Sequence, residues 1–104
     1  MPEMGRELTM QTNRLIVIGD MRSVRRFARS RWLKAVGGRY SDPLELSPRR
    51  YACQFETTQS PLPVLQRISR KYPQLVFLLD YELGRTKGLA MVKAGTLDDH
   101  QVTY

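Results

Sequence analysis

The sequence predicts an α+β domain, a two-layer sandwich in which two helices pack on one face of a four- or five-stranded, mainly antiparallel sheet. Two observations favour this class. Short β-branched or alternating apolar runs are typical of strands, and two segments between them carry apolar residues at helical spacing. The length of 104 residues fits one domain, and a hydrophobic fraction of 41% is enough for a core. The expected order of elements is β-α-β-α-β-β.

The first strand and the first helix are expected before residue 38. Residues 15–18, Leu-Ile-Val-Ile, form a β-branched run that predicts a strand buried on both faces. Asp20 follows as a helix cap, and the glycines at 37 and 38 end the helix. The apolar stripe of this helix consists of Met21, Val24, Ala28, Trp32 and Ala35, with Phe27 at its edge.

Arg31 lies within this apolar stripe when the sequence is projected on a helix. Either the helix is interrupted near Ser30, or the Arg31 side chain extends past the sheet edge to reach water. We favour the interruption. A pairing of Arg31 with Asp80 or Glu82 near the sheet edge is a third and weaker option.

A long connection, a strand and a second helix are expected next. Residues 36–50 contain two glycines and two prolines, which predicts a loop with room for a short strand near Arg39. Residues 51–57 alternate between two kinds of side chain, as a half-buried strand does. The Ser60-Pro61 pair is typical of a helix start, and Pro73 ends that helix.

A hairpin completes the predicted sheet. Residues 75–82 and 86–93 are strand-like runs, and the short polar link between them contains Gly84. Gly88 inside the second run predicts a bulge or a close approach of another group. Residues 96–104 are expected either to add an edge strand or to fray.

The domain boundary and the location of the protein follow from the ends and from composition. Residues 1–12 are polar and lack periodicity, so we expect a flexible N-terminal arm before a single domain at 13–104. The first ten residues carry Glu3 and Glu7 and no apolar run, unlike a signal peptide. No apolar run approaches the ~20 residues of a membrane helix. We therefore expect a cytoplasmic protein.

Three stretches of the chain carry a family resemblance. Residues 13–19 read Asn-Arg-Leu-Ile-Val-Ile-Gly, residues 55–61 contain Phe-Glu-Thr and Ser-Pro, and residues 72–84 contain Tyr-Pro-Gln-Leu-Val-Phe, Tyr-Glu and a glycine. Together they resemble plasmid- and phage-encoded proteins with a YubB-type ferredoxin-like domain. Thr58-Gln59 departs from a tryptophan expected there, and residues 35–38 depart from an Asn-Trp-Gly-like segment. The resemblance implies a ferredoxin-like fold and a mobile-element setting, and it implies no activity.

Arginine is the strongest chemical feature of the sequence. The formal net charge is +7, and residues 22–39 hold seven basic side chains and no acid. Guanidinium groups make planar two-point contacts with phosphate, so this pattern predicts contacts with a nucleic-acid backbone. The alternative is a solvated helix face, although such faces usually interleave acids with bases. The predicted contact residues are Arg22, Arg25, Arg26 and Arg29, joined by Arg67, Arg70 and Lys71 of the second helix.

Signals for catalysis, metal binding and base stacking are poor, so we expect no enzyme, no metal and no cofactor. His100 follows two aspartates, but adjacent side chains of an extended strand cannot converge on one ion. Cys53, the single cysteine, alternates with core residues, which favours a buried thiol over a nucleophile. Nothing in the sequence fixes a carboxylate pair among Glu56, Asp80 and Glu82. The aromatic residues at strand positions are expected in the core: Tyr51, Phe55, Phe77 and Tyr81.

Two functions remain in competition. The leading hypothesis is a small, basic, non-catalytic domain of mobile-element origin that binds DNA or RNA through phosphate contacts from the arginine-rich helix. The alternative is a protein-binding or inhibitory module, which would dock on an acidic partner or form a homodimer through a sheet edge at residues 86–93 or 96–104. Small-molecule or metal sensing is a third reading that rests on fold analogy alone.

Overall fold

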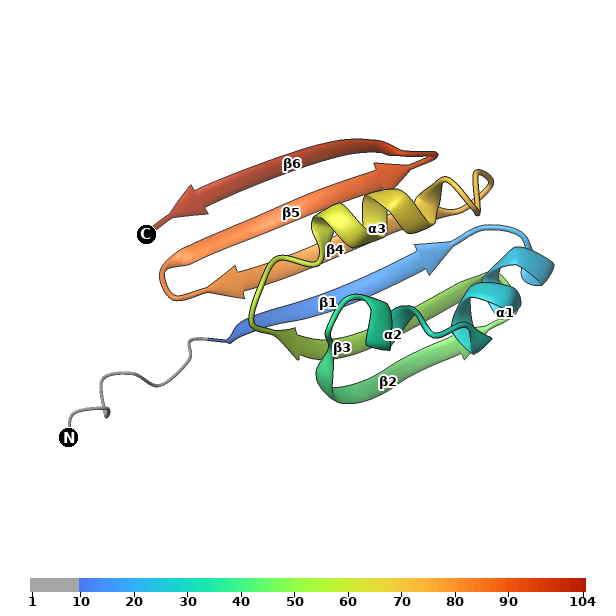
Figure 1. Cartoon of the computed structure of the whole chain (residues 1–104), viewed down its shortest axis with the longest axis horizontal. Coiled ribbons are helices and arrows are strands. Elements are labelled where there is room, and N and C mark those ends of the chain that lie inside the picture. The colour runs from blue at the N-terminus through green and yellow to red at the C-terminus, as the bar shows by residue number, and fades with distance from the viewer. Residues whose placement is uncertain (1–9) are drawn as a thin grey trace.

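A computed structural model describes residues 10–104 as one six-stranded antiparallel sheet with helices on one face (Figure 1). The strand order across the sheet is β2-β3-β1-β4-β5-β6. The strands are β1 (Gln11–Ile18), β2 (Arg39–Ser47), β3 (Arg50–Thr57), β4 (Val76–Leu83), β5 (Thr86–Lys93) and β6 (Thr96–Thr103). The helices are α1 (Met21–Arg29), α2 (Trp32–Ala35) and α3 (Leu62–Ser69).

Two helical connections each link a pair of parallel strands that have one antiparallel strand between them. β3 and β4 flank β1 and both run antiparallel to it. β2 is antiparallel to β3, so β1 and β2 run in the same direction with β3 between them. The chain therefore makes two interleaved split β-α-β units, one through α1 and α2 and one through α3. Crossovers of one hand place their helices on the same face of the sheet.

The predicted two-helix, ferredoxin-like sandwich of four or five strands in order β-α-β-α-β-β is wrong. The described chain has six strands and three helices in the order β-α-α-β-β-α-β-β-β. β2 runs over nine residues where only a short strand near Arg39 was expected within a loop, because eight of its residues are exposed and it lacks the alternation that marks a half-buried strand. β6 is also almost wholly exposed, and it is a full strand rather than a frayed end.

The first helical segment is interrupted where Arg31 predicted it. α1 ends at Arg29, and the Ser30 hydroxyl donates a 2.6 Å hydrogen bond to the Phe27 carbonyl. Arg31 is exposed at the start of α2. With the helix interrupted, the buried side of α1 differs from the predicted apolar stripe. Phe27 is fully buried and not at the edge of that side, whereas Met21 is 46% exposed.

The core lies between the helices and one face of the sheet, and aromatic rings dominate it. Phe27 is fully buried and contacts four rings, with centroid distances of 5.2–6.1 Å. These rings come from α2, β3, the turn after α3 and β4: Trp32, Tyr51, Tyr72 and Phe77.

The other face of the sheet has no covering layer within residues 10–104, which corrects the expectation for the first strand. Leu15 and Val17 of β1 are fully buried, but Ile16 is half-buried and Ile18 is 38% exposed. β1 is therefore buried on one face only. We call the uncovered side of the sheet the free face.

β1 begins within the segment expected to be a flexible arm. Gln11 and Thr12 are part of β1, and residues 1–9 of the expected arm lie outside the described residues. Gln11 donates a 2.7 Å hydrogen bond to the amide oxygen of Asn13, and Asn13 donates to the Thr57 hydroxyl at 3.1 Å. All three side chains are buried, and these bonds satisfy polar groups that burial would otherwise penalise.

α3 is bound to the β5–β6 hairpin as well as to the core. The turn of this hairpin is Ala94-Gly95, with positive φ at both residues, as a two-residue type I′ turn requires. Gln66 donates to the Gly95 carbonyl at 2.7 Å, and the Gly95 amide donates to the buried Ser69 hydroxyl at 2.8 Å. The last two strands are thus an integral part of the domain.

The side chain of Tyr81 passes over Gly88 of β5 to reach β6, and this close approach requires a glycine at position 88. The Tyr81 hydroxyl donates to the Asp99 carboxylate at 2.7 Å and accepts from the Gln101 amide at 2.8 Å. A Cβ added at Gly88 would lie 2.1 Å from Cζ of Tyr81. The close approach predicted for Gly88 is therefore confirmed.

The substitution Gly88→Ala tests this packing. Because the Tyr81 ring is held by two hydrogen bonds on β6, it cannot yield easily, and we expect a loss of about 1–3 kcal/mol in the free energy of unfolding. Chemical denaturation measures it, with Lys71→Ala, an exposed residue just after α3, as the control. Equal losses in the two variants would show that the Tyr81 ring does not depend on Gly88.

Candidate nucleic-acid interface

α1 presents its arginines to solvent because its opposite side is fixed by the core. Asp20 caps the helix, and its carboxylate accepts from the Ser23 amide at 2.9 Å, which lowers the pKa of Asp20. Val24 and Phe27 are the buried side chains of α1. The four predicted contact residues of this helix are all exposed: Arg22, Arg25, Arg26 and Arg29.

α3 adds the three other predicted residues, and Tyr72 connects the two groups. Arg67, Arg70 and Lys71 are exposed at the C-terminal end of α3 and just after it. Tyr72 follows directly, and the Arg26 guanidinium lies 5.8 Å from the centroid of its ring, within cation–π range. Arg26 of α1 therefore contacts the segment that follows α3, directly after Lys71.

The charge of the helical layer is strongly one-sided. Residues 20–38 and 58–75, which form the helices and their flanking turns, contain nine Lys or Arg and one carboxylate, Asp20. Among residues 10–104, ion pairs join Arg50 to Glu45 and His100 to Asp98, and none involves a helical arginine. We call this exposed set the basic layer: Arg22, Arg25, Arg26, Arg29, Arg31, Lys34, Arg67, Arg70 and Lys71.

One further cation borders this layer and was missed in the sequence. The β2–β3 turn carries Arg49, whose carbonyl accepts from the Gly19 amide at 3.1 Å, next to the start of α1. Arg49 is exposed. The hairpin pattern around Pro48 is visible in the sequence, but only the pairing of β3 with β1 places this turn beside α1.

The strand aromatics do not form a stacking surface. Phe55, Phe77 and Tyr81 are buried and Tyr51 is half-buried, all on the side of the sheet that the helices cover. Burial raises the pKa of Tyr51 to about 12. The expectation that these rings belong to the core is confirmed.

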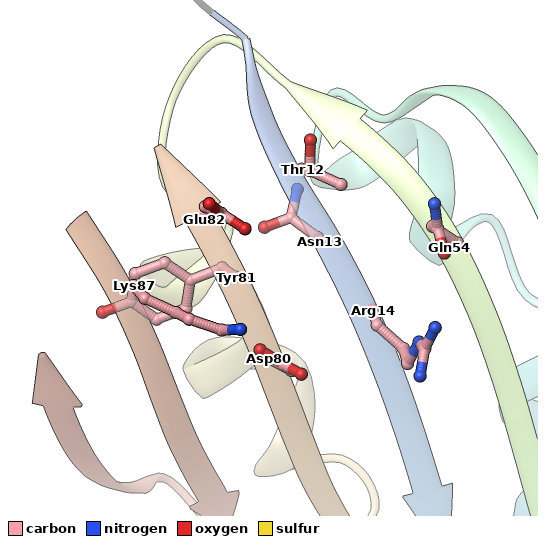
Figure 2. Close-up of a pocket in the computed structure, with 8 residues that line it drawn as sticks. All are labelled: Thr12, Asn13, Arg14, Gln54, Asp80, Tyr81, Glu82 and Lys87. Atoms are coloured by element: carbon pink, nitrogen blue, oxygen red, sulfur yellow. The ribbon is translucent and has the colours of Figure 1, made fainter. Parts of the chain in front are cut away.

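The free face carries charges of both signs around a shallow hollow (Figure 2). Arg14 of β1 lies between Gln54 of β3 and Asp80 of β4 in the strand register. Glu82 and Lys87 are cross-strand neighbours one row further on. Acidic and basic side chains are therefore neighbours on the free face. The basic layer, in contrast, is almost entirely cationic, so the two faces of the domain differ in charge.

The remaining reactive side chains lie apart from each other. His100 and Asp98 are on the free face, 3.0 Å apart, while Asp99 points to the helical side and binds Tyr81. Among residues 10–104 no group of three or more His, Cys, Asp or Glu side chains is placed to hold a metal ion. Cys53 is 2% exposed, and burial raises the pKa of its thiol.

Comparisons with known proteins leave the chain unassigned. No family model, no curated protein and no solved structure matched it. The resemblance to proteins with a YubB-type domain therefore stays a prediction. Within residues 10–104, no helix is long and apolar enough to cross a membrane.

The buried thiol gives a test of how closed the core is. We expect Cys53 to react with a water-soluble disulfide reagent at pH 8 at least about a hundredfold more slowly in the native protein than in denaturant, since burial blocks access and keeps the thiol protonated. The absorbance of the released thiolate reports the rate. Equal rates in both conditions would mean that β3 is not covered.

Proposed function

We propose that this protein is a non-catalytic domain that binds nucleic acid through phosphate contacts from its basic layer. The contacts are made by Arg22, Arg25, Arg26 and Arg29 of α1 and by Arg67, Arg70 and Lys71 of α3. We expect this to take place in the cytoplasm, where DNA and RNA are accessible to a binding domain.

The observation that carries this proposal is the segregation of charge. Nine cations and one carboxylate occupy the helical layer, and no ion pair among residues 10–104 neutralises a helical arginine. Cations gathered without counter-charges repel one another, so an anionic ligand that sits among them is stabilised. A polyanion carries enough negative charge to neutralise these cations together.

The geometry of α1 suits a linear anion. Its arginines recur at i, i+3, i+4 and i+7, which places them along one side of the helix over about 10 Å at 1.5 Å per residue. Arg26 is further oriented by the Tyr72 ring, which limits the freedom it loses on binding. Arginine suits such a role because its planar fork binds phosphate in a bidentate way.

Strand addition at a sheet edge has weaker support. β2 is one edge, and its pairing with β3 shifts register twice, on either side of Asp42 and Pro43. A proline and bulges on an edge strand hinder pairing with a further strand. β6, the other edge, carries Asp98, Asp99 and His100 in succession, and charged side chains also discourage pairing.

Binding to fluorescent single- and double-stranded oligonucleotides across a salt series tests the proposed function. We expect the logarithm of the association constant to fall linearly with the logarithm of salt concentration, with a slope of about −0.9 for each phosphate contact on a duplex. The double variant Arg25→Glu, Arg29→Glu should reduce the steepness by about 2 and weaken binding at every salt concentration.

A matched control separates this interface from net charge. Arg39→Glu with Arg85→Glu makes the same change in net charge on exposed residues of β2 and of the β4–β5 turn. It should bind far more tightly than the α1 variant, and circular dichroism should show both variants folded. If the α1 variant bound as well as the unmodified protein at matched salt, the basic layer would not be the binding surface.

A further inference from the structure

The free face combines apolar side chains at its centre with charges around them. Ile16 and Leu78, direct neighbours on β1 and β4, are half-buried, and Met91 of β5 continues the row at 46% exposure. Leu89, in the next row of β5, is 60% exposed. Apolar side chains gathered at the middle of an otherwise polar sheet face are typical of a contact surface.

The size of this face suits a stable interface. Six strands at about 4.8 Å spacing and eight residues at about 3.3 Å each give an area of roughly 700 Å² per copy. Two such faces together bury roughly 1,400 Å², which lies within the range of specific protein–protein interfaces.

The charges of the free face are nearly balanced, in contrast to the basic layer. The strand register places five cations on this face: Arg14, Arg39, Arg50, Lys87 and Lys93. It places six carboxylates beside them: Asp42, Glu45, Glu56, Asp80, Glu82 and Asp98. A surface with this balance repels a polyanion at its carboxylates, but it can match a second surface with the same pattern.

We propose that two copies of this chain pack their free faces together about a two-fold axis that runs parallel to the strands, between β1 and β4. This axis passes through the middle of the sheet, with three strands on each side, so the overlap of the two faces is the largest that the sheet permits. Two antiparallel sheets packed in this way form an aligned sandwich with a separation of about 10 Å.

The rotation pairs complementary side chains near the middle of the face. It exchanges β1 with β4 and β3 with β5 while it keeps each cross-strand row in place, so Arg14 faces Asp80 of the partner subunit. By the same operation Ile16 faces the partner's Leu78, and Glu56 faces the partner's Lys87. Each of these contacts occurs twice, as an isologous interface requires.

At the rim of the face, the rotation places Arg50 opposite the partner's Lys93 and Glu45 opposite the partner's Asp98. The ion pair between Arg50 and Glu45 within each chain moderates both repulsions.

Arg14 and Asp80 are available for this contact. They are cross-strand neighbours in one chain, yet no ion pair joins them, and Figure 2 shows their side chains lying apart on the free face. Within residues 10–104 neither charged end takes part in an ion pair, so each can meet the opposite charge across the interface.

Charge reversal gives a sharp test of this arrangement. The unmodified protein should be a dimer by light scattering coupled to size-exclusion chromatography. Arg14→Asp alone or Asp80→Arg alone places like charges opposite each other at two contacts, and each should raise the dimer dissociation constant at least about tenfold. Arg25→Asp, on the basic layer, should leave it unchanged.

Mixing the two single variants distinguishes a contact between chains from one within a chain. In a mixed dimer every reversed side chain faces its opposite charge, so equimolar Arg14→Asp and Asp80→Arg should dimerise with a lower dissociation constant than either variant alone. The double variant Arg14→Asp, Asp80→Arg should also dimerise by itself. Circular dichroism verifies that each variant is folded, and a variant that is not is replaced by Arg14→Gln or Asp80→Asn.

Three outcomes would overturn the proposal. An unmodified protein that is monomeric at 100 μM or so would exclude a specific dimer of the expected affinity. Single variants that both keep the dimer dissociation constant of the unmodified protein would point to edge pairing through β6 instead of the free face. A mixture that stays monomeric would exclude the two-fold axis between β1 and β4. None of these outcomes depends on nucleic-acid binding.

Discussion

The position of Phe27 is the constraint on which the helical layer depends. α1 has nine residues, fewer than an isolated helix needs to be stable in water, so packing against the sheet must hold it in place. Phe27 supplies that packing, because its ring contacts four others from both halves of the sheet and from the turn after α3. At 100° per residue, a buried Phe27 obliges Arg25, Arg26 and Arg29 to point outwards.

The same constraint joins core and surface at Tyr72. This half-buried ring packs at 89° to the ring of Phe27, and its face receives the Arg26 guanidinium. A single side chain therefore belongs to the core and to the basic layer. The charge pattern of the helices is a consequence of how the aromatic cluster is built, and not an independent feature of the surface.

Local signals in the sequence predicted the elements that have strong side-chain patterns. The Asp20 cap, the interruption at Ser30 and the close approach at Gly88 each follow from one residue type in one context. β2 could not be predicted in this way, because its side chains face water on both sides and its place is fixed by backbone pairing with β3 alone. The observed fold differs from the predicted one mainly by the full-length strand β2 and the short helix α2.

The two candidate interfaces also differ in how much of each could be predicted from the sequence. Exposure of the α1 arginines follows from helical periodicity and is visible in the sequence. The contact of α1 with Tyr72 depends on packing between distant segments. The position of Arg14 beside Asp80 depends on the register between β1 and β4. No pattern within a single segment carries that information, because register is a property of pairs of strands.

The unequal charge of the two faces gives the domain a large electric dipole across its shortest dimension. That dimension is 21 Å, while the screening length at physiological salt is about 8 Å. Salt therefore screens most of the electrostatic potential of one face at the position of the other. A single copy near a polyanion therefore experiences a torque that turns its helices forward before contact, whereas in the proposed dimer the two dipoles cancel and a basic layer faces outwards on both sides. In either state, the segregated charge attracts an anion to the helices more strongly than the same net charge of +7 spread evenly over the surface.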